Sequence, residues 1–215
     1  MLEVHPPNEP VHGWRDFFIH LATIAIGLLI ALSLEGCVEF WHHRSLVHEA
    51  EASMQIEIEA NARELQRALD DVRKEQNFLK KDIAVMKKII ANPRVPNNEE
   101  MTVNFRIRTF ADVSWKTAQS TGALSYMPYE RAEKYARIYS AQNEIAEAEH
   151  QAVRDTVLSV APFLNSKKGD VNPGGEEAVK IVDRLEVLQG QLIFLEDQMK
   201  RLDGEYKKFL AAHSG

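Results

Sequence analysis

FFIHLATIAIGLLIALSL, residues 17–34, decides the organisation of this chain. The stretch contains no aspartate, glutamate, lysine or arginine, and His20 is its only ionisable side chain. As a helix it would extend about 27 Å, close to the roughly 30 Å thickness of the hydrocarbon layer of a bilayer. Trp14 precedes it and Trp41 follows it, at positions suited to the two membrane interfaces. The sequence therefore predicts a transmembrane helix over residues 14–38.

The regions on either side of this helix differ in composition. Residues 1–13 hold three prolines and no apolar period, which predicts a disordered tail. Residues 39–215 are long enough for one extramembrane domain. The chain carries a formal net charge of -6 and no basic stripe with interleaved aromatic residues, so we expect no binding to nucleic acid. The one cysteine, Cys37, excludes an intramolecular disulfide framework.

Two processing alternatives compete with a retained membrane anchor. A signal peptide needs a positively charged N-terminal region, but Arg15 is the only basic side chain before the apolar run. The sequence Leu34-Glu35-Gly36-Cys37 loosely matches a lipoprotein cleavage box, in which Cys37 would become a lipidated N-terminus. Glu35 occupies a position where that signal has a small or β-branched residue. We therefore favour the retained anchor.

The orientation of the helix depends on the basic residues at its ends. Arg15 adjoins the N-terminal end, whereas Glu35 and Glu39 precede Arg44 at the C-terminal end. Because loops with more lysine and arginine stay inside, this difference favours an N-inside, C-outside topology.

A heptad pattern follows the apolar run without a helix-breaking residue between them. Its spacing alternates between four and three, which keeps one face of the helix towards a partner. The apolar series, interrupted by one glutamine, is Ile58, Ala62, Leu65, Leu69, Val72, Gln76, Leu79, Ile83, Met86 and Ile90. Asn92-Pro93 predicts the end of this helix, because the residue before proline avoids the α region.

Three more helices are expected after a turn at residues 92–98. Asn98 suits the start of the second helix, which we expect to run to Ser120 and to end at Gly122. Residues 103–110 alternate as in a β-strand, but no second strand exists to pair with them, so we predict helix there. The third helix begins near Pro128, ends near Ala161 and carries two apolar stripes.

The last helix, residues 176–212, has the most regular heptad in the chain. Its series is Ala178, Ile181, Leu185, Leu188, Leu192, Leu195, Met199, Leu202, Tyr206 and Phe209. Together these patterns predict an all-α protein, in which an N-terminal transmembrane helix continues into an antiparallel helical bundle with coiled-coil packing.

Several short motifs stand out along the chain: Trp41-His42-His43-Arg44 after the span, Asn61-Ala62-Arg63-Glu64-Leu65, Trp115 followed by Thr121-Gly122-Ala123-Leu124, and tyrosines such as Tyr135 and Tyr139. In these motifs the chain resembles a group of uncharacterised bacterial single-pass membrane proteins. The resemblance implies the bacterial inner membrane as the location, but it carries no activity.

Several histidines are candidates for a site. Glu39 with His42 and Glu147 with His150 have the Glu-x-x-His spacing of di-metal carboxylate proteins, but the helix lengths would place the two pairs far apart. We therefore expect solvated side chains, and no metal or cofactor. His42, His43 and His48 lie with Glu35 and Glu39 at the membrane interface, where anchoring is favoured over a metal or proton-responsive role. His20 lies four residues from Asp16, and pairing or snorkelling explains it.

Two further groups of residues are candidate binding surfaces. Aromatic side chains around the Thr-Gly-Ala-Leu turn could line a small-ligand pocket, although core packing is the commoner role; they are Trp115, Tyr126, Tyr129, Tyr135 and Tyr139. Thr23, Gly27 and Ala31 form a ridge of small residues through which two spans could pack as a parallel homodimer. Such a dimer would bring two copies of Cys37 together.

The sequence thus favours a non-enzymatic protein in the lipid bilayer that acts by binding an unidentified protein partner. An extracytoplasmic module that senses a small ligand and signals through a separate partner is the alternative. An enzyme is disfavoured, because no phosphate-binding loop, nucleophile elbow or zinc-binding cysteine pair occurs in the sequence.

Overall fold

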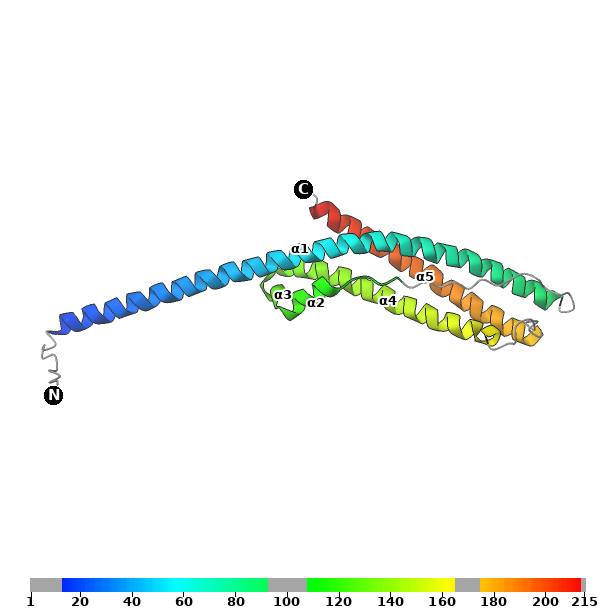
Figure 1. Cartoon of the computed structure of the whole chain (residues 1–215), viewed down its shortest axis with the longest axis horizontal. Coiled ribbons are helices and arrows are strands. Elements are labelled where there is room, and N and C mark those ends of the chain that lie inside the picture. Colours follow the sequence, from blue (N-terminus) through cyan, green and yellow to red (C-terminus); the bar gives the residue numbers. More distant parts are fainter. Residues whose placement is uncertain (1–12, 93–107, 165–174, 214–215) are drawn as a thin grey trace, which may run out of the picture. The chain divides into compact units, whose positions relative to one another are not determined.

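The computed structural model describes residues 13–92, 108–164 and 175–213. These residues form five helices and their connections, with no strand among them, so the protein is all-α as predicted (Figure 1). The helices are α1 (Gly13–Ala91), α2 (Val113–Ser120), α3 (Ala123–Tyr126), α4 (Tyr129–Leu164) and α5 (Gly175–His213). Residues 1–12 of the predicted tail and residues 93–98 of the predicted turn lie outside the described residues.

The chain divides into two compact units, Met1–Glu49 and Ala50–Gly215. The described part of the first unit is the N-terminal half of α1. Its most apolar window has a mean hydropathy of 2.4, and none of that window is buried. One helix near the N-terminus is thus long and apolar enough to cross a membrane, in agreement with the sequence. Because α1 is continuous, this apolar helix leads without interruption into the second unit.

The boundaries of α1 follow local chemistry. Gly13 has a φ of +77°, a left-handed conformation that glycine adopts without steric cost, and Asp16 lies in the first turn, where the helix dipole favours a negative charge. The helix ends at Ala91, directly before Asn92-Pro93, as predicted.

In the second unit, the predicted face of α5 forms the core. All ten residues of its heptad series are buried, and Ala178, Leu192, Met199 and Tyr206 have no exposed surface. Each buried leucine contributes roughly 1.5–3 kcal/mol relative to an exposed one. This helix therefore contributes one continuous apolar face to the core of the second unit.

The predicted face of α1 is buried as well, but it is incomplete. Seven of its ten residues are buried and the remaining three are half-buried. The structure also buries a second set of α1 residues, which recur every seven positions and mostly precede a residue of the predicted series by one. This set is Met54, Asn61, Ala68, Glu75, Asp82 and Ile89. Half of this set is polar, and a search for apolar periodicity alone therefore misses it.

The buried face of α4 also differs from the prediction. It combines members of both predicted stripes in one series with alternating spacings of three and four: Tyr135, Ile138, Gln142, Ile145, Glu149, Ala152 and Thr156. The polar residues Gln142, Glu149 and Thr156 share one heptad position. Because these three residues are polar, the apolar pattern in the sequence appears as two separate stripes.

Hydrogen bonds between helices give their directions within the second unit. The pairs between α1 and α5 are Gln66–Asp203, Arg73–Glu196 and Lys87–Glu186. The pairs between α4 and α5 are Gln142–Tyr206 and Asp155–Gln191. In both sets residue numbers rise along one helix and fall along the other, so α5 runs antiparallel to α1 and to α4. The pairs Arg131–Glu51 and Tyr139–Glu57 show that α4 runs parallel to α1. Figure 1 shows α4 and α5 side by side.

The predicted second helix is wrong over residues 108–112. These residues are not helical, and α2 begins only at Val113. The predicted part before residue 108 lies outside the described residues. The end of α2 agrees with the sequence, because Gly122 follows it with a φ of +76°.

We predict that Leu69→Asp or Leu192→Asp lowers the free energy of unfolding by about 3 kcal/mol or more, since each places a charge in a buried position. Leu69 is 4% exposed and Leu192 is 0% exposed. The measurement is denaturant unfolding of the full chain in detergent micelles, followed by circular dichroism. Glu147→Ala and His150→Ala serve as controls, because both side chains are exposed and their loss should change stability by well under 1 kcal/mol. If the control substitutions destabilised the protein and the leucine substitutions did not, this result would contradict the assigned core.

Candidate functional site

The segment Arg108–Asp112, which we call the strap, is fixed to α1 by one asparagine side chain. The Asn61 amide nitrogen donates to the Ala111 carbonyl at 2.7 Å, and the Asn61 side-chain oxygen accepts the Ala111 backbone N–H at 2.9 Å. Asn61 is 3% exposed. One side chain thus satisfies both backbone groups of Ala111, as a neighbouring strand would. The sequence offers no second strand to pair with this segment and therefore predicts helix, whereas in the structure the Asn61 side chain makes the hydrogen bonds that a second strand would make.

Ionic contacts hold the N-terminal end of the strap. The Arg108 guanidinium lies between two carboxylates of α1, with Nη1 at 2.5 Å from Glu64 and Nη2 at 2.7 Å from Asp71. The hydrogen bond from Arg108 holds the pKa of Glu64 below its usual value, although burial opposes this shift. Glu64 and Asp71 are seven residues apart, which is about two turns of α1. Because Arg108 bridges them, it fixes the position of the strap along α1.

A glutamate from α1 holds the start of α2. Glu57 Oε2 accepts the backbone N–H of Ser114 at 3.0 Å, in the first turn of α2. Asp112, at the N-cap position, makes no capping hydrogen bond with its side chain. Glu57 therefore supplies both the acceptor and the negative charge that a helix N-terminus favours. Its other oxygen, Oε1, accepts the hydroxyl of Tyr139 at 2.7 Å, which joins α4 to the same point.

The aromatic residues predicted as a pocket lie in three different environments. Trp115 stacks on Tyr139, with ring centroids 5.2 Å apart and planes 16° apart. Tyr135 is buried and makes an edge contact with Phe209 of α5 at 5.2 Å. Tyr126 and Tyr129 are 51% and 80% exposed. Burial raises the pKa of Tyr135 to about 12 and raises the pKa of Tyr139 as well, as expected of core hydroxyls.

Beside the strap, α4 contributes a buried acid. Glu149 is 2% exposed, and its Oε2 has no hydrogen-bond partner in the described part of the chain. Burial raises the pKa of Glu149 to about 7, and the backbone N–H and charge of Arg108 oppose this rise. Arg108, the first residue of the strap, therefore acts on Glu149 of α4 as well as pairing with Glu64 and Asp71 of α1. Seven residues earlier on α4, the Gln142 side-chain amide donates a hydrogen bond to the hydroxyl of Tyr206 at 2.8 Å.

The candidate dimer ridge on the apolar helix is open. A methyl group added at Gly27 would meet nothing within 4 Å. The Thr23 hydroxyl donates to the Ile19 carbonyl at 2.8 Å, so the polar atom of the ridge is satisfied within its own helix. Ala31 completes this surface, where all residues are exposed.

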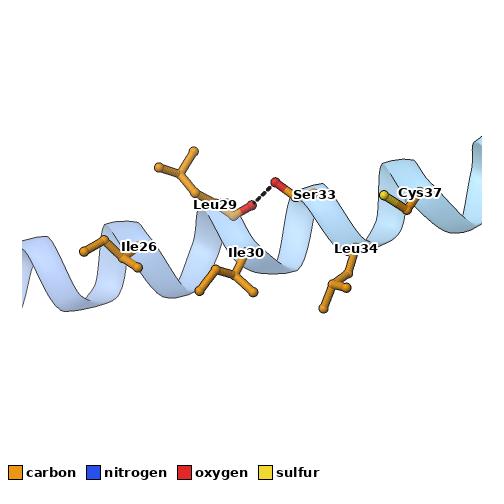
Figure 2. A pocket seen from close by; sticks show the side chains of 6 residues that line it. All are labelled: Ile26, Leu29, Ile30, Ser33, Leu34 and Cys37. Carbon is orange, nitrogen blue, oxygen red and sulfur yellow. Dashed lines mark hydrogen bonds between the residues drawn. The ribbon is translucent and has the colours of Figure 1, made fainter.

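A shallow hollow of about 300 Å³ lies on another part of the same helix (Figure 2). Its lining residues are Ile26, Leu29, Ile30, Ser33, Leu34 and Cys37. All of them come from α1, so the hollow is a space between side chains of one helix. The Ser33 hydroxyl donates to the Leu29 carbonyl at 2.7 Å, and Cys37 is an exposed free thiol.

The histidine candidates are all on the surface or half-buried. His42 and His43 have ring centroids 6.0 Å apart, and His43 is half-buried. His20, Glu147 and His150 are exposed. Within residues 13–92, 108–164 and 175–213, no three histidine, cysteine or acidic side chains are grouped as metal ligands would be.

Sequence reasoning missed the residues that join the strap and the start of α2 to their neighbours: Glu57, Asn61, Glu64, Asp71, Arg108 and Glu149. Asn61 and Glu64 belong to the Asn-x-x-Glu-Leu motif, and the alternation of residues 103–110 indicated an extended segment. These two signals lie about fifty residues apart, and neither alone shows that they meet.

Comparisons of the chain with models of known protein families, with curated proteins and with solved structures find no match.

We predict that Asn61→Ala loosens the strap, because it leaves the N–H and C=O of Ala111 without their partner. The expected loss in unfolding free energy is about 1–3 kcal/mol. Hydrogen exchange of peptides covering residues 108–112 should accelerate as well. Asn143→Ala is the matched control, since Asn143 is exposed on α4 and its loss should cost less than about 0.5 kcal/mol. Equal exchange of the strap in both variants would show that Asn61 does not hold it.

Proposed function

We propose that this chain is a single-pass protein of the bacterial inner membrane, whose helical domain works by binding other proteins. The proposal involves no catalysis and no cofactor. The observation that carries it is the apolar N-terminal half of α1, which has a mean hydropathy of 2.4 and no burial in its most apolar window. Water would be an unfavourable environment for this surface, because each buried CH₂ group is worth about 0.8 kcal/mol. A lipid bilayer would cover it.

The continuity of α1 supports retention of this helix. Cleavage before Cys37 would cut α1 in its interior, where Glu35 and Gly36 are helical. Arg15 and Arg44, the nearest basic residues at the two ends, favour the N-inside orientation, in which the second unit would lie outside the cytoplasm.

The second unit is proposed to be an antiparallel bundle with coiled-coil packing. The support is the three series of buried residues with spacings of three and four, on α1, α4 and α5, and the hydrogen bonds that pair these helices. A bundle of this kind presents long, stable helix surfaces rather than an enclosed substrate cavity, which suits a role in protein binding.

An apolar patch on this unit is the proposed surface for a protein partner. Leu158 of α4 and Val187 of α5 are both 61% exposed and line one groove of about 320 Å³, whose other lining residues are the charged Asp155, Asp183 and Arg184. Phe194 is 59% exposed and lies seven residues after Val187, on the same face of α5. Large exposed aromatic and aliphatic side chains of this kind mark interaction surfaces.

Self-association through the span is the second part of the proposal. The open ridge at Thr23, Gly27 and Ala31 would let two helix backbones approach closely. Cys37 is exposed on the same helix and would lie near its copy in a parallel dimer.

Isolation of the full chain from native membranes in mild detergent tests the anchor and the partner surface together. We expect an intact mass that includes residues 1–36, and a stoichiometric partner that Phe194→Glu loses. Ile56→Glu, which charges a comparably exposed residue of α1, should retain the partner. A chain that begins at Cys37 would refute the anchor. Equal capture of the partner by both variants would refute the patch.

Crosslinking through Cys37 in native membranes tests the dimer. The wild-type chain should give a crosslinked dimer, and Gly27→Leu should reduce it about tenfold or more, because the added side chain separates the backbones. Ala25→Leu places the same side chain on a different face and should leave the crosslink unchanged. An undiminished crosslink in Gly27→Leu would remove this ridge from the proposal.

A further inference from the structure

The strap lies on α1 and α4 in the manner of a bound peptide. Asn61 of α1 accepts the N–H of Ala111 at 2.9 Å and donates to the C=O of the same residue at 2.7 Å. This two-point contact recognises an extended backbone and makes no demand on the side chain, since Ala111 is exposed. From α4, the carboxyl group of Glu149 interacts with the backbone N–H of Arg108. Main-chain groups of the strap are thus recognised from two helices.

The side-chain contacts of the strap select an arginine. Arg108 is half-buried, with Nη1 at 2.5 Å from Glu64 and Nη2 at 2.7 Å from Asp71. A planar guanidinium has donors on several sides and can bridge two carboxylates, whereas the ammonium group of a lysine is a single point of charge. Phe110 of the strap is half-buried as well. The site therefore fits an extended segment with an arginine three residues before the residue that Asn61 binds.

This site holds more acidic groups than the strap pairs with basic ones. Three carboxyl groups, those of Glu64, Asp71 and Glu149, act on a single arginine of the strap. Arg67 also pairs with Glu64 and Lys74 with Asp71, but the two basic side chains are 68% and 69% exposed. Pairs at the surface are weakened by water and salt. The charge of the site thus favours a cationic segment over a neutral or acidic one.

The strap does not satisfy every polar group of the site. Glu149 is 2% exposed, and its Oε2 has no hydrogen-bond partner in residues 13–92, 108–164 and 175–213. A buried acceptor without a donor costs free energy, and such atoms are uncommon in folded proteins. An occupant with one more donor beside this carboxyl group would recover that loss. The strap is therefore an imperfect ligand for the site that holds it.

We propose that this site binds an extended, arginine-containing segment of a protein partner, and that the strap occupies it as an internal competitor. The hydrogen bonds and ion pairs that hold the strap can be replaced one for one by a peptide with the same groups. The start of α2 can stay in place, because Ser114 is held by Glu57 and Trp115 stacks on Tyr139. This inference rests on the proposed protein-binding function, for which it names the chemistry of a partner.

Peptide binding by Arg108→Ala tests the site in the full chain in detergent micelles. The probe is a fluorescently labelled peptide with blocked ends and the sequence of residues 108–112, Arg-Thr-Phe-Ala-Asp. The wild-type chain should bind it weakly, because the strap competes from the same chain at a high effective concentration. Arg108→Ala should bind it about tenfold more tightly, because the strap then no longer pairs with Glu64 and Asp71. Fluorescence anisotropy gives both dissociation constants.

A matched peptide and matched variants identify the contacts. The peptide with alanine in place of its arginine should bind Arg108→Ala about tenfold less tightly. Adding Asn61→Ala to Arg108→Ala should remove the binding, because the peptide backbone loses its two-point contact. Adding Asn143→Ala instead should leave the binding unchanged, since Asn143 is exposed on α4.

Several results would overturn the inference. They are equal binding of the two peptides, equal binding by the wild type and Arg108→Ala, binding that persists with Asn61→Ala, and no binding of any kind, in which case the strap is a structural element only. The site shares no residue with the patch around Phe194, and the titration needs no captured partner. A negative result here therefore leaves the test with Phe194→Glu unaffected.

A second measurement applies if circular dichroism shows that Arg108→Ala does not fold. An excess of the arginine peptide, added to the wild-type chain, should displace the strap and accelerate hydrogen exchange of residues 108–112. The alanine peptide should leave that exchange unchanged. Equal exchange rates with the two peptides would overturn the inference.

Discussion

The paired hydrogen bonds between the Asn61 side chain and the Ala111 backbone fix the strap against α1, and the neighbouring contacts depend on them. With Ala111 in place, Arg108 reaches Glu64 and Asp71, and Ser114 reaches Glu57. The same geometry brings Trp115 onto Tyr139. A short extended segment between helices is unstable alone, because its backbone groups lose water without gaining partners. The Asn61 side chain supplies hydrogen-bond partners for both backbone groups of Ala111.

Polar residues also define how the helices align. Gln76 donates to the Leu192 carbonyl and to Glu196, and Gln142 donates to Tyr206. Leucine-rich faces can slide by one heptad at little cost, whereas a displaced buried amide would lose its partner. The polar positions within the buried series therefore favour one alignment of α1, α4 and α5 over alternatives shifted by seven residues.

The sequence predicts those parts of the structure that depend on apolar spacing or on proline and glycine. The α5 face, the end of α1 at Ala91 and the end of α2 before Gly122 belong to this class. The α4 face was divided into two stripes, because Gln142, Glu149 and Thr156 occupy a core position without being apolar. Local sequence predicts helix for the strap, because the Asn61 side chain that pairs with its backbone lies fifty residues earlier in the chain. Local patterns do not reveal such a partner, and the spacing of titratable residues says little about their burial.

The distance along the chain between paired helices has a consequence for biosynthesis. Gln66 of α1 pairs with Asp203 of α5, 137 residues later. At a synthesis rate of about 5–20 residues per second, the face of α1 that carries Leu65 and Leu79 waits on the order of ten seconds for its partner. During this interval the nascent helix exposes leucines to other chains. The glutamate and aspartate at positions 75 and 82 lie on the same side, where their charges disfavour aggregation until α5 has been made.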